Sequence, residues 1–127
     1  MSGRLDAAAV VMSEVRSDLS WSVLDDHLTG QVIARLPPRI SSEVAAATCV
    51  EIAQKLVERT QPTVVVIDLY DVDYLYAAAP LAGVKVLLPV ASLLDRFDFI
   101  VRRRFVRIAA ISAARVLGVR YTVRSTR

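Results

Sequence analysis

The 127-residue sequence has a single cysteine, Cys49, and a single histidine, His27. A lone cysteine rules out a disulfide framework, and the two residues together are too few for a Cys/His metal cage or a clustered Cys–His catalytic motif. We interpret Cys49 as a small buried apolar residue rather than as a reactive thiol. His27 lies in the polar stretch DDHLTG, which is typical of an exposed turn rather than of a catalytic site.

Long apolar runs are also missing. No run reaches the roughly 18 to 20 residues needed to cross a bilayer, so we expect no membrane insertion. The short apolar patch near the start lies between Asp6 and Glu14, unlike a secretory signal. Apolar residues nevertheless make up 54% of the chain, enough for one core at this length. We expect a single cytoplasmic domain over residues 18–127, preceded by a helical or flexible extension over residues 1–17.

Charge is distributed unevenly along the chain. Residues 96–127 contain nine arginines and one acidic residue, Asp98, which gives +8. Because the whole chain carries +3, the first 95 residues must sum to −5. The last quarter of the chain is therefore a candidate for binding negatively charged partners.

The hydrophobic pattern of the first half predicts two strands and a helix. LSWSVLDDHLTGQVIARLPPRI alternates on both sides of a turn that ends at Gly30, and Pro37 stops the second strand. SSEVAAATCVEIAQKLVERT predicts a helix capped by Ser41 or Ser42. Its apolar face is expected to contain Val44, Ala47, Ile52, Leu56 and Val57.

The second half predicts alternating strands and helices. TVVVIDL is apolar throughout, as in a central strand, and closes at Asp68. Residues 77–94 favour a helix kinked at Pro89, although VKVLL could instead form a short strand. FDFIV and RYTVR are predicted strands, separated by the helix RRRFVRIAAISAARVLG with Gly118 as its C-terminal cap. The inner face of this helix is expected to contain Phe105, Ile108, Ala109, Ser112 and Val116.

The resulting order, β-β-α-β-α-β-α-β, resembles the STAS domain, the family of anti-sigma-factor antagonists and related sulfate-transporter and stressosome modules. The resemblance covers about residues 18–125 and rests on ARLPPRISSEVAAATCVEIAQKL, VVVIDLYDVDYL and FDFIVRRRFVRIAAISAARVLGV. It implies an α/β, SpoIIAA-like single domain. Such a domain has a mixed four- to five-stranded sheet with three to four helices.

Many STAS domains carry Asp-Ser-Ser-Gly, or a close variant, after the central strand, and a partner kinase phosphorylates a Ser or Thr there. The corresponding residues here are Tyr76, Ala77, Ala78 and Ala79, or one position later if Pro80 takes the glycine position. Neither register offers a Ser or Thr hydroxyl, so the resemblance implies a module without the usual phospho-switch. The alanines could be simple helix formers or part of a docking surface.

We therefore expect a non-catalytic regulatory module that binds a protein and needs no cofactor. The resemblance implies that its partner is an anti-sigma kinase, another STAS protein or an ATPase subunit of a transporter. Self-association through the apolar stretch AAAPLAG would also fit. The predicted partner-binding residues are Asp71, Asp73, Tyr74, Tyr76, Ala77, Ala78, Ala79 and Leu81.

A catalytic role for the carboxylates is the first competing interpretation. Asp68, Asp71 and Asp73 could bind Mg²⁺ or accept a phosphoryl group, as in receiver domains. Receiver domains also need an acidic pair after an earlier strand and a lysine after a later one, and both are missing here. We expect Asp68 to bind turn amides and the other two to face water, and we do not expect an enzyme.

The alternative function is that of a small basic nucleic-acid-binding α/β protein. A helical wheel places Arg104, Arg107, Ile111 and Arg115 on one side, which predicts a second surface. Few aromatic residues lie among these arginines, so base stacking has little support. An isoleucine ringed by arginines fits a protein interface equally well.

Overall fold

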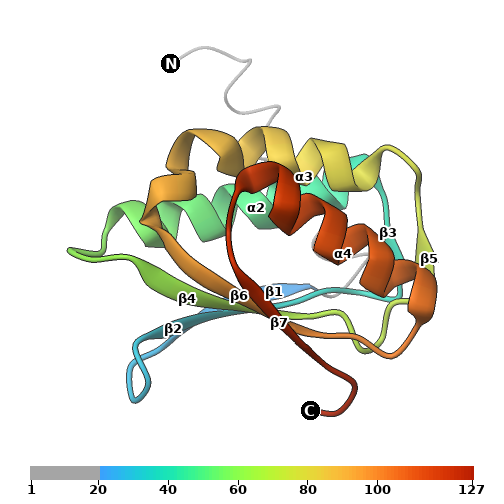
Figure 1. Ribbon diagram of the computed structural model, residues 1–127, viewed down its shortest axis with the longest axis horizontal. Coiled ribbons are helices and arrows are strands. Elements are labelled where there is room, and N and C mark those ends of the chain that lie inside the picture. Colours follow the sequence, from blue (N-terminus) through green and yellow to red (C-terminus); the bar gives the residue numbers. More distant parts are fainter. Residues whose placement is uncertain (1–20) are drawn as a thin grey trace, which may run out of the picture.

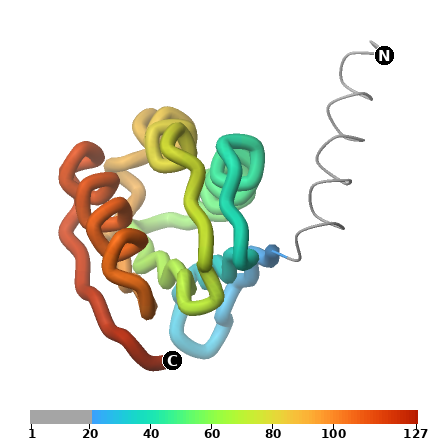
Figure 2. The backbone as a smooth tube through the Cα atoms, turned by 90° about the vertical axis from the view of Figure 1, so that its right-hand side faces the viewer, coloured from blue at the N-terminus to red at the C-terminus, as the bar shows by residue number. Residues whose placement is uncertain are grey.

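The computed structural model of the protein describes residues 21–127, so the predicted N-terminal extension lies outside the described residues. Among the described residues, the three α-helices lie on one face of a five-stranded sheet (Figures 1 and 2), whose strand order is β1-β2-β4-β6-β7. A second, two-stranded sheet pairs β3 with β5. The elements are β1 Ser22–Asp26, β2 Gln31–Arg35, β3 Arg39–Ile40, α2 Ser42–Val57, β4 Thr63–Asp68, β5 Tyr74–Leu75, α3 Ala79–Leu87, the 3₁₀ helix η1 Leu88–Leu93, β6 Leu94–Ile100, α4 Arg104–Leu117 and β7 Tyr121–Arg124.

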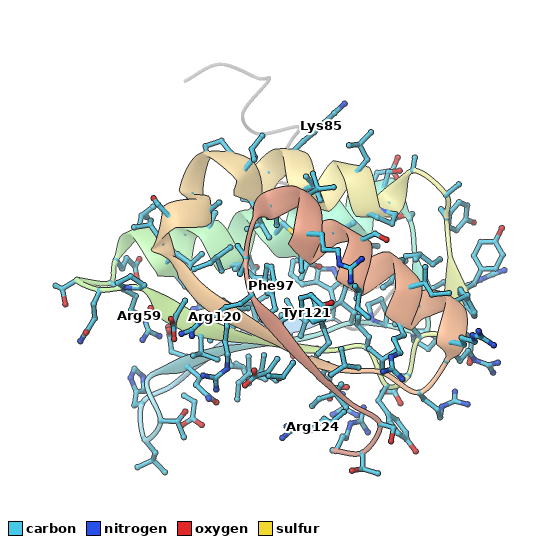
Figure 3. All side chains as sticks on the ribbon, viewed as in Figure 1. Arg59, Lys85, Phe97, Arg120, Tyr121 and Arg124 are labelled. Atoms are coloured by element: carbon cyan, nitrogen blue, oxygen red, sulfur yellow. The ribbon has the colours of Figure 1, made fainter. Side chains whose placement is uncertain are left out.

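The large sheet is mixed, with β4 at its centre. β1 runs antiparallel to β2, whereas β2, β4, β6 and β7 are parallel to one another. Val65 and Val66 of β4 point to opposite faces and are both buried, which explains the unbroken apolar run. Phe97 of β6 lies between the sheet and the helices, as Figure 3 shows. Because the strands are parallel, β2, β4 and β6 bring their carboxyl ends to the same side of the molecule.

The first helix, α2, follows the sequence pattern closely. The Ser41 hydroxyl caps it by accepting the Val44 N–H at 3.2 Å. The predicted inner residues Val44, Ala47, Ile52 and Leu56 are buried. Val57 is 61% exposed, so its predicted place on that face is wrong. One residue along a helix turns the side chain by about 100°, which carries Val57 away from the sheet.

The segment around Pro89 is neither one kinked α-helix nor a strand. Val84 to Leu87 belong to α3, so the alternative strand over VKVLL is wrong. The α-helix ends at Leu87 and continues as the 3₁₀ helix η1. Proline has no N–H for the α-helical bond, and a tighter 3₁₀ turn accommodates it. The chain then enters β6 directly at Leu94.

The last helix, α4, buries a different face from the predicted one. Its buried residues are Val106, Ala110, Ala114 and Leu117. The side chains of Phe105, Ile108, Ser112 and Val116, predicted to face inward, are exposed, whereas Ala109 is half-buried. Apolar residues surround much of this helix, so its pattern alone does not select the buried side. Small alanines let α4 approach its neighbours closely, and this packing decides the orientation.

Gly118 ends α4 as predicted. Its φ of +70° lies in the left-handed region, which glycine adopts at little cost. The Gly118 N–H donates to carbonyls of the last turn, and the Val119 N–H donates to the Ala114 carbonyl at 3.0 Å. These bonds satisfy the terminal carbonyls and turn the chain into β7.

The small sheet of β3 and β5 was not predicted, and it fixes the segment after β4. The Pro38 carbonyl accepts the N–H groups of Asp73 and Tyr74 at 2.7 and 3.0 Å. The Tyr76 N–H donates to the Ile40 carbonyl at 3.0 Å. The chain just before α3 is thereby held beside the chain that enters α2.

Asp25 joins β1 to the last turn of α2. Its carboxylate accepts hydrogen bonds from Arg59 and, at 3.1 Å, from Lys55. The Arg59 hydrogen bond is the main reason why the pKa of Asp25 is lowered, and Lys55 adds to the effect. A carboxyl group with a lowered folded-state pKa contributes stability above its unfolded pKa and loses it as the pH falls through the folded value.

We therefore predict that the free energy of unfolding declines as the pH drops below about 4, the ordinary range of aspartate. Asp25→Asn should lower stability at pH 7 and weaken this acid dependence. Some slope should remain, because the pKa values of Asp71 and Asp98 are lowered too. Urea unfolding at a series of pH values measures both effects. An unchanged pH profile in Asp25→Asn would contradict the prediction.

Candidate functional site

An exposed pair of tyrosines precedes α3. The rings of Tyr74 and Tyr76 meet edge to face, with centroids 4.9 Å apart and planes at 79°. Their exposed fractions are 49% and 46%, so about half of each side chain is accessible to a partner. The Arg39 guanidinium lies 5.6 Å from the centroid of the Tyr74 ring, within cation–π range. β3, β5 and the residue that follows β5 thus present two aromatic rings and a cation to the outside.

The start of α3 adds small and apolar side chains to this pair. Ala78 is the N-cap residue and has no side-chain oxygen to bind the free N–H groups. Ala77 is exposed, and Leu81 is 56% exposed. Ala79 is instead fully buried in the core, so it cannot contact a partner as the sequence led us to expect. We call the exposed set the tyrosine surface: Tyr74, Tyr76, Ala77, Ala78 and Leu81.

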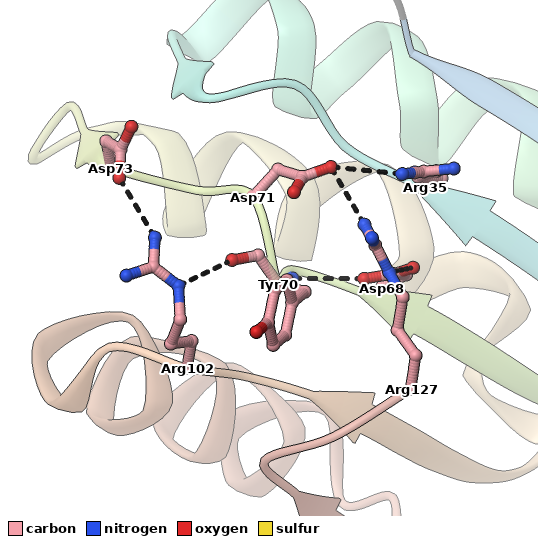
Figure 4. A network of polar contacts seen from close by, with 7 residues as sticks. All are labelled: Arg35, Asp68, Tyr70, Asp71, Asp73, Arg102 and Arg127. Atoms are coloured by element: carbon pink, nitrogen blue, oxygen red, sulfur yellow. Dashed lines mark hydrogen bonds and ion pairs between the residues drawn. The ribbon is translucent and has the colours of Figure 1, made fainter.

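Beside this surface lies a network of arginines and aspartates, drawn in Figure 4. Asp68, at the carboxyl end of β4, is buried, and its Oδ1 accepts the Tyr70 N–H at 3.0 Å. Its Oδ2 accepts Nε of Arg127 at 2.9 Å. The prediction that Asp68 binds a turn amide is therefore confirmed.

Asp71 and Asp73 are each held by two arginines. Asp71 Oδ2 accepts Nη2 of Arg127 at 2.8 Å and Nη2 of Arg35 at 3.2 Å. The Arg127 hydrogen bond is the main cause of the lowered pKa of Asp71. Asp73 Oδ1 lies 3.2 and 3.0 Å from Nη2 of Arg102 and Arg103. Both carboxylates are part-exposed, as predicted, but each also forms ion pairs with arginines in addition to its contact with water.

Tyr70 lies between two of these arginines. The guanidinium carbons of Arg127 and Arg102 are 4.9 and 5.6 Å from its ring centroid. The described residues contain no cluster of three or more His, Cys, Asp or Glu side chains that could hold a metal ion. Asp68, Asp71 and Asp73 engage arginines of the protein itself.

The second predicted surface, on α4, is only partly assembled. Arg104, Arg107 and Arg115 are exposed, whereas Ile111 is half-buried rather than fully exposed to solvent. Five of the nine arginines in residues 96–127 pair with an aspartate: Arg96, Arg102, Arg103, Arg120 and Arg127. Much of the positive charge seen in the sequence is thus neutralised by aspartates, most of them from earlier in the chain.

Sequence reasoning missed the arginines that complete the network. Arg127 and Asp68 are 59 residues apart, and Arg102 and Asp73 are 29 apart. The opposite charges of the two parts of the chain were the one available signal. That signal indicates attraction between the parts but names no pair.

Comparisons with known proteins bear on the fold. No protein-family model and no curated protein matches the chain. Among solved structures, the fold is similar to that of an uncharacterized protein of the DUF3478 family from Shewanella loihica PV-4, which has a SpoIIAA-like fold. The TM-score is 0.64 at 14% identity, and the match covers 86% of this chain and 87% of that chain. The predicted SpoIIAA-like α/β fold is thereby confirmed, and at this identity the likeness extends to the fold alone.

One further property concerns membranes. No helix in residues 21–127 combines the length and the apolar character of a membrane span.

Proposed function

We propose that the chain is a non-catalytic protein-binding module of the STAS type, and that a partner protein docks on the tyrosine surface. The observation that carries this proposal is the exposed edge-to-face pair of Tyr74 and Tyr76, with the Arg39 guanidinium 5.6 Å from the Tyr74 ring and an exposed Leu81 in the helix that follows. Tyrosine and arginine are enriched at the energetic centres of protein interfaces. The pair also stands at the site where the STAS resemblance places the contact with a partner.

The missing phosphoacceptor defines how this module would be regulated. Residues 77–79 are alanines and carry no hydroxyl group. Binding would therefore be constitutive and set by the supply of the partner. By the same resemblance, the partner would be a cytoplasmic anti-sigma kinase, another STAS protein, a transporter ATPase subunit or a second copy of the chain.

The two competing functions have weaker support. The carboxylates nearest to a strand end are occupied by arginines, which disfavours their use in metal binding or phosphoryl transfer. Arg104 and Arg107 make no ion pair with any residue from 21 to 127, but the aspartate pairs reduce the positive field around them. Light-scattering mass determination at about 0.1 M and 1 M salt, with and without mixed nucleic acid, tests the nucleic-acid alternative directly. Co-elution that vanishes at high salt would favour it.

The decisive experiment compares two variants of the tagged full chain in its own cells. Tyr74→Ala/Tyr76→Ala removes both rings of the tyrosine surface. Leu28→Ala is the matched control, because Leu28 is 99% exposed on the turn between β1 and β2, at the amino end of β2. A partner captured by the wild type and by Leu28→Ala, but lost from the double variant, is then purified for calorimetry.

We predict that the double variant weakens this partner's Kd by at least about tenfold, the effect expected of an interface hot spot. Leu28→Ala should leave the Kd within about twofold. A second variant, Ala78→Asp, should also weaken binding, whereas its carboxylate at the start of α3 should stabilise folding by about 0.3–1 kcal/mol. Equal affinity of all variants for the partner would refute the tyrosine surface as the docking site.

A further inference from the structure

An apolar cavity of about 120 Å³ lies between the helices and the large sheet. All three α-helices and the large sheet contribute to its wall, through residues that include Cys49, Ile67, Val84, Phe97 and Ala110. The one hydroxyl group among the lining side chains belongs to Thr48, and it already donates to the Val44 carbonyl at 2.7 Å. The wall therefore offers a ligand no free hydroxyl donor.

Small residues on facing helices create this space. Gly83 of α3 and Ala109, Ala110 and Ala113 of α4 all border the cavity. Larger side chains at these positions would fill it. Protein interiors are otherwise close-packed, and an empty space of this size forfeits dispersion contacts along its whole lining.

Side chains of α3 and α4 that border the cavity are part-exposed. They belong to Pro80, Ala109 and Ala113. Phe105 lies one turn before Ala109 on the same side of α4 and is 46% exposed. An apolar molecule arriving between these two helices would meet apolar side chains both outside and inside.

We propose that this cavity binds a small apolar ligand, a group about the size of a benzene ring, which enters between α3 and α4. An engineered protein cavity of about 150 Å³, lined by Leu, Ile and Phe, stays dry and binds benzene or xenon. The cavity described here is slightly smaller and similarly apolar. A polar ligand would lose its hydrogen bonds to water without replacement, so the site selects against it.

The ligand would lie next to the start of α3, which is part of the tyrosine surface, but its binding does not depend on the exposed side chains of that surface. Ala79 and Pro80 line the cavity and belong to the same helix start as Ala78. The tyrosine rings themselves are not part of the wall. Loss of ligand binding and loss of partner binding can therefore be produced by different substitutions and told apart.

The test uses benzene as the probe and the full chain labelled with ¹³C at its methyl groups. Benzene should give saturable NMR shifts at the lining methyls of Ile52, Ile67 and Leu87, with a Kd on the order of 1 mM. The exposed methyls of Leu24 and Leu28, which are not part of the wall, should not shift. Unsaturable shifts spread over exposed methyls, or no shifts at all, would overturn the proposal.

A pair of leucine substitutions on α4 sharpens the test. Ala110→Leu places a side chain in the cavity and should weaken benzene binding at least about tenfold while folding remains as stable or becomes more stable. Ser112→Leu adds the same side chain on the exposed side of α4 and should leave the Kd within about twofold. Should Ala110→Leu fail to fold, Ala113→Val makes a smaller addition to the same wall. Undiminished benzene binding by a folded cavity-filling variant would refute the site.

Discussion

Replacing Leu56 with alanine is expected to reduce the free energy of unfolding by about 3 kcal/mol, within the usual range for a buried leucine. Leu56 is completely buried on the sheet-facing side of α2. Its truncation removes apolar contacts and leaves a void that the surrounding side chains fill only in part. Urea unfolding measures the loss as a lower midpoint, with an unchanged slope if the compactness of the two states is the same.

The adjacent residue provides the control. Val57 is 61% exposed although it belongs to the same helical turn, so Val57→Ala should change stability by no more than about 0.5 kcal/mol. The two substitutions delete similar side chains one position apart. If both substitutions lowered the free energy of unfolding by similar amounts, Val57 would be buried as well as Leu56, and the orientation of α2 described here would be contradicted.

The thiol of Cys49 should react very slowly in the folded protein. Burial raises its pKa from 9.0 to about 12. Because the thiolate is the reactive form, a shift of this size leaves about a thousandfold less of it at neutral pH than an ordinary thiol has. Alkylation by iodoacetamide, followed by mass spectrometry, should therefore be about a thousandfold slower in buffer than in guanidinium chloride.

This comparison also reports where the sulfur lies. Cys49 is part-exposed, yet it lines the apolar cavity, and its Sγ would lie 3.1 Å from a Cβ atom added at Gly83. We infer that its accessible area faces the cavity rather than bulk water. Native alkylation at the rate of the unfolded chain would show that the sulfur is open to water. The unfolded chain is an internal control, since Cys49 is the only cysteine.

The order of the main elements could be predicted because each depends on a local signal. Ser41, Pro37 and Gly118 mark boundaries through their own hydrogen bonds or backbone angles, whatever the rest of the chain does. The apolar run of β4 likewise shows that it is central. These signals were sufficient to identify the fold by resemblance.

Features that depend on packing could not be predicted in the same way. The predicted inner face of α4 was wrong because several sides of this helix carry apolar residues. Only contact with the sheet and with α3 determines which of these sides is buried. The pairing of Arg39 with Tyr74 in the small sheet joins two residues separated by the whole of α2 and β4. Two-residue strands have no periodicity to detect.

The exposure of most side chains at the candidate site could be predicted from the sequence, but their contacts could not. Tyr74, Tyr76 and Leu81 are exposed, as a docking surface requires. Ala79, the first residue of α3, points inward, whereas the preceding Ala78 is exposed. Which of these two alanines is buried depends on the residue at which the helix begins. The ion pairs of Asp73 require the end of β6 to lie beside the turn after β4, which is information that no local pattern contains.

β7 is an outer strand of the large sheet, and the arginines near it bear on whether this edge can pair with another chain. An outer strand offers unpaired backbone groups to any other chain, and short length and charge are common protections against such aggregation. β7 has four residues, with Arg120 before it and Arg124 at its end. Arg120 is paired with Asp95, so two copies meeting along β7 would bring mainly their Arg124 side chains together, and this repulsion would reach about 10 Å at 0.1 M salt but only about 3 Å at 1 M. We therefore expect the short length of β7 and the charge of Arg124 to disfavour edge-to-edge pairing of two copies, most strongly at low ionic strength.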